Sequence, residues 1–246
     1  MSAAAKAKPR RAKAAPAGVR YTVSVLNAHA HLFAVTLQID RPAKHQRLSL
    51  PVWIPGSYLV REFSQNLQAL SASQGGAPIA LKQLDKHRWQ APCNADQPLE
   101  LRYEVYAFDA SVRTAFLDAS RGFFNATSLC LRVLGQEDLP HALELAPAPA
   151  LSDWQVATGL TPHRVDAQGF GQYLAENYDE LADCPVEMGA FWSASFTAAA
   201  LRLSLRLLIA PPHDRPGYPG LGPACGQARR LANQPELPQG PTQSGQ

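Results

Sequence analysis

The sequence is poor in cysteine and lacks paired cysteines. Its four cysteines, Cys93, Cys130, Cys184 and Cys225, lie far apart and form no CxxC pair. This spacing excludes a zinc ribbon, and a chain of 246 residues is too long for a scaffold held together by disulfides. We therefore expect free thiols, as in proteins of the reducing cytoplasm.

No segment has the pattern of an export signal or of a membrane span. The basic N-terminus is not followed by the apolar core that a signal peptide needs. The most apolar candidate for a span, residues 191–210, contains Arg202 and Arg206, and an arginine at the middle of a bilayer is costly. The sequence predicts a cytoplasmic protein with no membrane partner.

Histidine followed by glutamate is also absent. None of the seven histidines is followed directly by Glu, so an HExxH helix cannot occur in this sequence. In that motif two histidines bind zinc while the glutamate activates a water molecule. We therefore predict no metal site, no catalytic residues and no cofactor in this chain.

Acidic residues are missing from residues 1–18, which hold five lysines and arginines. Because the net charge of the whole chain is +3, the remaining residues carry about −2 by subtraction. Such a composition is typical of a disordered, solvated arm. The alternative is a non-specific, salt-sensitive attraction to nucleic acid or to an anionic surface. No aromatic residues are interleaved with the basic ones, so we expect no nucleic-acid partner.

Alternating apolar and polar residues dominate residues 19–174. The pattern is clear in HLFAVTLQI (31–39), LELRYEVYAF (99–108) and TSLCLRVL (127–134), and turn-forming residues separate these runs. A period of two residues is typical of half-buried strands, and no helical periodicity is evident before about residue 174. The sequence predicts a mainly β fold, in which this region forms an antiparallel two-sheet β-sandwich.

A second, incomplete domain is predicted over residues 175–209. It begins with AENYDELAD (175–183), a short acidic segment that suits one or two helical turns or a loop. Asp179 and Asp183 are expected to cap or brace this turn.

The segment PVEMGAFWSASF (185–196) is predicted to form a strand. Val186, Met188 and Ala190 would share one face, and Glu187 would lie on the opposite face. If the chain is a fragment, an unpaired apolar edge near residues 186–209 would promote aggregation.

The last stretch, residues 210–246, differs in composition from the rest. Residues 211–246 hold eight prolines and six glycines, and Tyr218 is their only aromatic residue. Such a segment cannot bury enough apolar surface to offset the entropy of ordering it, which predicts disorder. A shift of reading frame after about residue 197 is our sharper hypothesis, and recurrence of the tail in independently sequenced relatives would refute it.

The first of three ordered motifs is LPVWIPGSYLVREFSQNL (50–67). It predicts a strand that ends in a tight turn, because Pro55 fixes φ and Gly56 permits a positive φ. We expect a packed turn with a buried Trp53 rather than a ligand site.

The second motif is YEVYAFDASVRTAFLDASRGFFNATSLCL (103–131). Its loop carries Asp109, Arg113, Asp118 and Arg121, and an arginine fork matches a carboxylate. Two acids near two arginines suggest acid–base chemistry as the alternative, but a structural cluster of ion pairs is the favoured interpretation.

The third motif is NYDELADCPVEMGAF (177–191). Taken together and in this order, the three motifs resemble the glycyl aminopeptidase family of zinc metallopeptidases, peptidase family sixty-one. The resemblance covers roughly residues 19–197. It implies an N-terminal β domain followed by a thermolysin-like catalytic domain of which this chain holds the first strand. Zinc is the cofactor of the family.

The resemblance also implies a substrate-binding role for Glu187, Met188 and Gly189. Related aminopeptidases use a glutamate on an edge strand to bind the free α-amino group of a peptide, and Glu187 resembles that residue by position. A carboxylate facing an ammonium makes a charge-assisted hydrogen bond. The partner implied is a peptide N-terminus.

The chain departs from the family pattern after about Thr197, where no HExxH, third zinc ligand or PDZ domain follows. We therefore expect an N-terminal fragment of a glycyl-aminopeptidase-like enzyme, truncated and inactive alone. The alternative is a non-catalytic β-sandwich module that binds a peptide or a protein.

Overall fold

A computed structural model describes residues 18–54, 58–198 and 201–207. The chain divides into two compact units, residues 1–189 and residues 190–246, which are described separately. Apart from Gly18, the predicted N-terminal arm lies outside the described residues, as does the predicted tail. Among the described residues, none of the helices has the length and apolar character that a membrane crossing needs.

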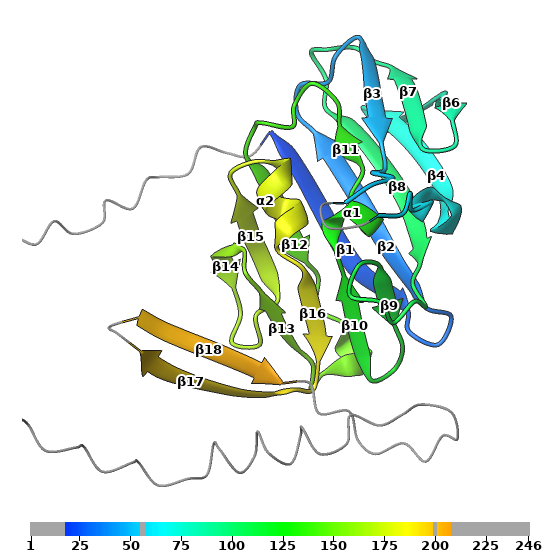
Figure 1. Cartoon of the computed structure of the whole chain (residues 1–246). Helices are drawn as coiled ribbons and strands as arrows, with labels where there is room; N and C mark the ends of the chain where they lie inside the picture. The colour runs from blue at the N-terminus through cyan, green and yellow to red at the C-terminus, as the bar shows by residue number, and fades with distance from the viewer. Residues whose placement is uncertain (1–17, 55–57, 199–200, 208–246) are drawn as a thin grey trace, which may run out of the picture. The chain divides into compact units, whose positions relative to one another are not determined.

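The first unit is built on an eight-stranded sheet with the order β14-β15-β12-β1-β2-β8-β4-β5 (Figure 1). Its strands are β1 (Val19–Asn27), β2 (Leu32–Ile39), β4 (Leu67–Gln74), β5 (Ala77–Ile79), β8 (Leu99–Tyr106), β12 (His141–Leu145), β14 (Thr161–Val165) and β15 (Gly171–Ala175). Neighbouring strands run antiparallel except β1 and β12, which are parallel.

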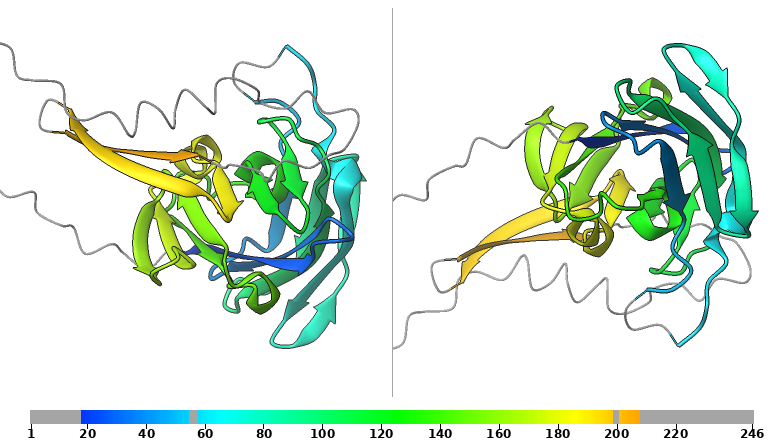
Figure 2. Two further views of the ribbon diagram at one scale, coloured as in Figure 1. Left: turned by 90° about the horizontal axis from the view of Figure 1, so that it is seen from below. Right: turned by 90° about the horizontal axis from the view of Figure 1, so that it is seen from above.

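Two four-stranded sheets lie over one face of the large sheet (Figures 1 and 2). The first has the order β13-β16-β10-β9, with strands β9 (Ala115–Leu117), β10 (Arg121–Phe124), β13 (Gln155–Thr158) and β16 (Val186–Gly189). The second has the order β11-β3-β7-β6, with strands β3 (His45–Ser49), β6 (Lys82–Asp85), β7 (Arg88–Pro92) and β11 (Arg132–Val133). Short helices lie in the connections between strands of the three sheets: η1 (Phe63–Asn66), α1 (Ala126–Leu129), η2 (Pro149–Leu151) and α2 (Tyr178–Asp183).

The core lies between these layers, and the alternating strands supply it. In β2 and β8 every second residue is buried, as the period of two predicted. Phe33 of β2 meets Phe124 of β10 edge to face, with ring centroids 5.7 Å apart, so the large sheet and a small sheet are in direct contact. The predicted mainly β sandwich is confirmed, with one of its two layers divided into two sheets.

The segment 127–134, predicted as a strand, is an exception. Its first residues belong to α1, and only Arg132 and Val133 pair with β3. Burial does not alternate over residues 127–131, because Ser128 and Cys130 are buried together with their apolar neighbours; it alternates only from Leu131 to Leu134. The prediction of a strand was therefore wrong for residues 127–131, which are enclosed between layers. It was correct for Arg132 and Val133, where the Arg132 side chain is 41% exposed.

Three tyrosine hydroxyls satisfy the backbone of this enclosed segment. Tyr103 of β8, Tyr178 of α2 and Tyr21 of β1 donate to the carbonyl oxygens of three successive residues, 129, 130 and 131, each at 2.8 Å. Burial raises the pKa of all three phenols well above its usual value, so they stay protonated donors. These hydroxyls replace the backbone N–H donors that a neighbouring strand would provide in a regular sheet.

His141 of β12 should make the fold sensitive to mild acid. Its side chain is buried, its ring stacks on Tyr21 and meets Tyr178 edge on, and Nδ1 donates to the carbonyl oxygen of Leu139 at 2.6 Å. Burial lowers the pKa of His141 from 6.5, and this outweighs the opposing effects of the Leu139 hydrogen bond and the Glu137 charge.

A histidine whose pKa is lower in the folded state favours folding when it is neutral, so stability falls as pH drops below about 6.5. The slope reaches about 1.4 kcal/mol per pH unit down to the folded-state pKa. Urea unfolding between pH 7.5 and 5 measures it, with His141→Gln as the non-titrating control. If His141→Gln loses the same free energy of unfolding between pH 7.5 and 5, groups other than His141 cause the loss.

The second unit holds a hairpin of β17 (Trp192–Ala198) and β18 (Leu201–Leu207). The two strands pair antiparallel, from Trp192 opposite Leu207 to Ala198 opposite Leu201. The strand predicted over residues 185–196 is thus divided between β16 and β17. Its first part lies in the first unit, and a catalytic domain beginning at residue 175 stays a prediction.

Candidate substrate-binding site

The three residues predicted to bind substrate form most of β16, which lies inside its sheet. β16 pairs with β10 on one side, where Glu187 lies opposite Phe123. It pairs with β13 on the other side, where Glu187 lies opposite Ala157. The expectation that Glu187 lies on an edge strand was therefore wrong, and the backbone of β16 is not free to pair with a peptide.

The predicted alternation is correct for residues 186–188, but Ala190, predicted to share the face of Val186 and Met188, lies beyond β16 and is exposed. Val186 and Met188 point into the core and are almost fully buried, whereas Glu187 lies on the outer face and its side chain is 26% exposed. Gly189 shares the outer face with Glu187 and has φ of 153°, a region that L-residues with side chains rarely adopt. Glu187 can thus be reached from solvent, whereas Met188 packs below the sheet.

Met188 fixes the strand through close packing against β10. A Cβ added to Gly122 would lie 3.1 Å from Cε of Met188 and 3.3 Å from the Trp154 ring. The absence of a side chain at Gly122 lets the core come this close to β10, and the two strands pair with Gly122 opposite Met188. That register places Arg121 and Glu187 on the same outer face.

Arg121 and Glu187 form an incomplete ion pair. Nε of Arg121 lies 3.5 Å from Oε1 of Glu187, beyond the usual 2.7–2.9 Å of a charge-assisted hydrogen bond. Both atoms are buried, and neither has a hydrogen-bond partner within the part of the chain that the structure describes. Burial raises the pKa of Glu187, and the charge of Arg121 only partly opposes it. A desolvated carboxylate without its full set of donors can accept a cationic donor from a ligand.

Arg121 is held in place by an aromatic ring as well. Its guanidinium carbon lies 5.2 Å from the centroid of Phe116, which stacks in turn on Phe108. A cation over an aromatic face within about 6 Å is attracted by the ring quadrupole. This contact keeps Arg121 beside Glu187 although the two make no close hydrogen bond.

The predicted cluster of Asp–Arg ion pairs in the 109–121 loop does not form. Oδ1 of Asp118 accepts hydrogen bonds from the backbone N–H of Ser120 and Arg121 and from the Ser120 hydroxyl. Burial alone would raise the pKa of Asp118, but these hydrogen bonds and the Arg121 charge lower it. Asp109 likewise accepts the backbone N–H of Ser111. Short turns, rather than ion pairs, take up these carboxylates.

Two further expectations need correction. Trp53 is 56% exposed instead of buried, because Ile54 and Phe63 fill the core beside this loop. The N-cap of α2 is Asn177, whose side chain accepts the backbone N–H of Glu180, so neither Asp179 nor Asp183 caps it. The cysteines that the structure describes, Cys93, Cys130 and Cys184, are free thiols as expected.

The described residues do not fit a zinc ion. Within residues 18–54, 58–198 and 201–207, no group of three or more His, Cys, Asp or Glu side chains could hold a metal. The sequence adds no HExxH outside them. A tetrahedral zinc site needs at least three protein ligands, so the described residues offer no place for one.

Comparison with known proteins bears on the identity of the chain. Residues 20–190 match the model of the peptidase M61 N-terminal domain. An aminopeptidase N family protein from Idiomarina loihiensis shares 41% identity and a TM-score of 0.76, over 80% of this chain and 33% of that protein. The chain therefore spans about a third of the length of that relative. No curated protein matches the sequence.

More distant structures include an M1 zinc metallopeptidase from Deinococcus radiodurans, with 10% identity and a TM-score of 0.42 over 76% of this chain and 46% of that one. Aminopeptidase A from Legionella pneumophila, in complex with aspartic acid, shows 8% identity and a TM-score of 0.43 over 77% of this chain and 23% of that one. Scores this low do not define the fold of the chain. The family model and the 41% relative do: the chain belongs to the M61 peptidase family, and residues 20–190 form its N-terminal domain.

Proposed function

We propose that this chain is the substrate-docking part of an M61 aminopeptidase, and that Glu187 binds the free α-amino group of a peptide. The observation that carries the proposal is the incomplete ion pair on β16. A half-buried carboxylate faces an arginine too distant for a strong hydrogen bond, and the facing atoms lack partners among the described residues. An ammonium brings three N–H donors of opposite charge to such a group.

Burial disfavours the charged form of Glu187 in the free domain, and binding residues commonly carry such a cost. The pKa of Glu187 is raised, so the folded state favours the protonated acid and stability decreases as pH rises through the titration of this group. A bound ammonium would stabilise the carboxylate and offset this cost. If Glu187 had only a structural role, no ligand would offset the free-energy cost of its buried charge.

The geometry of β16 determines how a peptide would approach. Because β10 and β13 occupy both edges of the strand, the peptide cannot add to the sheet as another strand. It would instead meet the outer face end on, with its N-terminus over Glu187. Met188 holds the strand from below and does not touch the ligand.

We propose further that a polypeptide of this sequence binds peptides without hydrolysing them, because it contains no HExxH. The same observations support the second candidate, a binding module with no catalytic role. β16 is paired on both sides, so the unpaired edge expected of a fragment is not found at residues 186–189. The two candidates share the Glu187 site and differ in whether that site serves an M61 aminopeptidase or a separate binding protein.

One experiment tests both statements. The 246-residue chain is mixed with zinc and trialanine, binding is followed by calorimetry, and release of alanine is followed by mass spectrometry. We expect binding without cleavage, and a loss of affinity of about ten-fold or more in Glu187→Gln, since hydrogen bonds to charged groups contribute about 1.5–3 kcal/mol. Acetylated trialanine lacks the ammonium, so it should bind to the wild type and to Glu187→Gln with the same weak affinity.

Glu144→Gln is the matched control, because burial also raises the pKa of Glu144, which lies on β12 of the large sheet. It should leave affinity unchanged. Glu187→Gln should also unfold at the same temperature as the wild type or a higher one at pH 7, and the difference should vanish near pH 3. Zinc-dependent release of alanine would overturn the non-hydrolytic assignment, and equal affinity in Glu187→Gln would overturn the site.

A further inference from the structure

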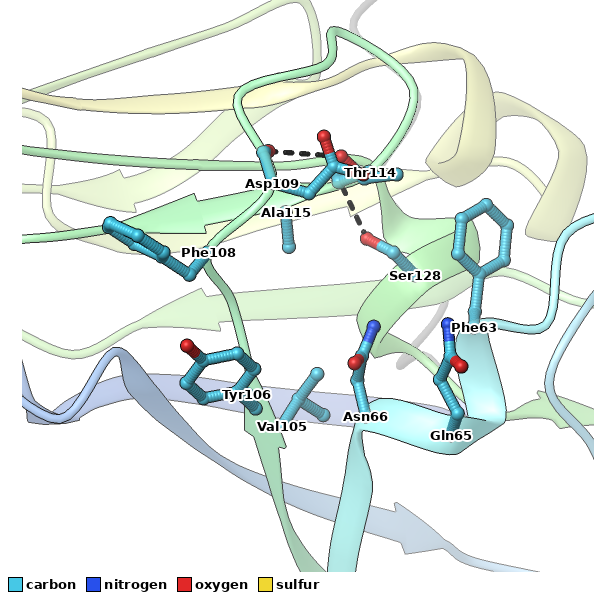
Figure 3. A pocket seen from close by; sticks show the side chains of 10 residues that line it. All are labelled: Phe63, Gln65, Asn66, Val105, Tyr106, Phe108, Asp109, Thr114, Ala115 and Ser128. Atoms are coloured by element: carbon cyan, nitrogen blue, oxygen red, sulfur yellow. Dashed lines mark hydrogen bonds between the residues drawn. The ribbon is translucent and has the colours of Figure 1, made fainter.

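A small pocket opens in the first unit where β8 leaves the large sheet (Figure 3). It has a volume of about 160 Å³ and is walled by residues of η1, the end of β8, the following loop and α1. Sites for drug-sized ligands have volumes of about 300–1,000 Å³, so this pocket has the size of a single side chain rather than of a cofactor. Glu187 and Arg121 are not among its lining residues.

Two aromatic rings form one wall, and both are accessible. Tyr106 is 43% exposed and Phe108 is 49% exposed. Behind them His31 contacts Tyr106 edge on at 5.9 Å and lies 3.9 Å from the Phe108 ring, centroid to centroid. Nδ1 of His31 donates to the carbonyl oxygen of Leu117, which fixes the imidazole. The wall is thus held in position before any ligand arrives, which lowers the entropy cost of binding.

The polar groups of the pocket favour a cation. All ten lining residues belong to the described part of the chain, and Asp109 is the only charged residue among them. One of its oxygens accepts the backbone N–H of Ser111, which orients the carboxylate. Figure 3 shows the carboxamides of Gln65 and Asn66 side by side at the opposite rim. Within the described residues, neither carboxamide has a hydrogen-bond partner.

We propose that this pocket binds the guanidinium group of an arginine side chain in a peptide. The flat group stacks against Tyr106 or Phe108 and donates to the Asp109 carboxylate. In Figure 3 the nitrogen atoms of the Gln65 and Asn66 carboxamides point toward Ser128, so each carboxamide turns over to offer its oxygen to the ligand. Guanidinium suits these partners better than ammonium, because it is planar, weakly hydrated and has five donors in a fixed plane. The site does not depend on the role of Glu187.

Calorimetry with N-acetyl-arginine amide tests the proposal, because the blocked N-terminus removes the group proposed to bind at Glu187. The matched neutral ligand is N-acetyl-citrulline amide, which keeps the shape and loses the charge. We expect saturable binding of the arginine compound, at least about five-fold weaker binding of citrulline, and a similar loss in Asp109→Asn. The asparagine oxygen can still accept the Ser111 N–H, so the loop is retained. Glu144→Gln, on β12 and outside both proposed sites, should bind as the wild type does.

Each other result would overturn the proposal. No saturation with the wild type, or equal affinity for arginine and citrulline, would show that the pocket does not select a cation. Unchanged binding in Asp109→Asn would place the ligand elsewhere, and a loss in Glu187→Gln would place it at β16. Much tighter binding of free arginine than of the blocked compound would identify an amino acid, not a peptide side chain, as the ligand.

Discussion

Phe124→Ala should lower the free energy of unfolding by about 3–5 kcal/mol, the range for truncating a buried phenylalanine. Phe124 is fully buried on β10, and its ring meets Phe33 of the large sheet edge to face. The truncation removes a contact between the two layers and leaves a cavity that neighbouring strands cannot fill without breaking their pairing. Because β10 also carries Arg121, the change should weaken the proposed binding site together with the fold.

Urea unfolding followed by circular dichroism measures this loss. Phe108→Ala is the matched control, because it removes the same atoms from a ring that is 49% exposed. Its cost should stay below about 1.5 kcal/mol, the scale of an aromatic pair contact. Equal losses in the two variants would mean that Phe124 does not join the layers.

The regular strands were the most predictable part of the fold. In β2 and β8 the apolar residues recur at a period of two, and the structure buries those residues. A strand with one solvated face must show this alternation, so its sequence carries the signal locally. The single-turn helix α1 has no such signal, because all four of its residues are buried. Enclosure by other layers is a tertiary property that no local period reveals.

The candidate site, too, could be predicted only in part from the local sequence. The face of β16 that carries Glu187 follows from alternation alone. Its partner Arg121 lies in a separate motif, and only the register of β10 against β16, with Arg121 opposite Gly189, brings the two side chains together. Both motifs were recognised in the sequence, yet nothing within either one specifies that register. Trp53 illustrates the opposite error: a large aromatic residue before a turn suggests burial, but Ile54 occupies the core instead.

Tyr103→Phe should cost about 2–4 kcal/mol although it removes a single oxygen atom. The Tyr103 hydroxyl donates to the carbonyl oxygen of Leu129 and accepts from the N–H of Leu131, so its loss leaves two buried backbone groups without partners. Each such group costs about 1–3 kcal/mol. Urea unfolding at pH 7 gives the value, and Tyr58→Phe, at a fully exposed position, should change stability by less than about 0.5 kcal/mol.

The three tyrosines provide an internal scale for this prediction. Tyr21 and Tyr178 each donate to one carbonyl oxygen of the enclosed segment. Their phenylalanine variants should therefore lose about 1–3 kcal/mol, less than Tyr103→Phe. If all three variants lose the same amount, the N–H of Leu131 does not depend on Tyr103. If none of the three variants loses more stability than Tyr58→Phe, water must reach the backbone of residues 129–131 and replace the tyrosine hydroxyls. The layers around α1 would then not exclude water.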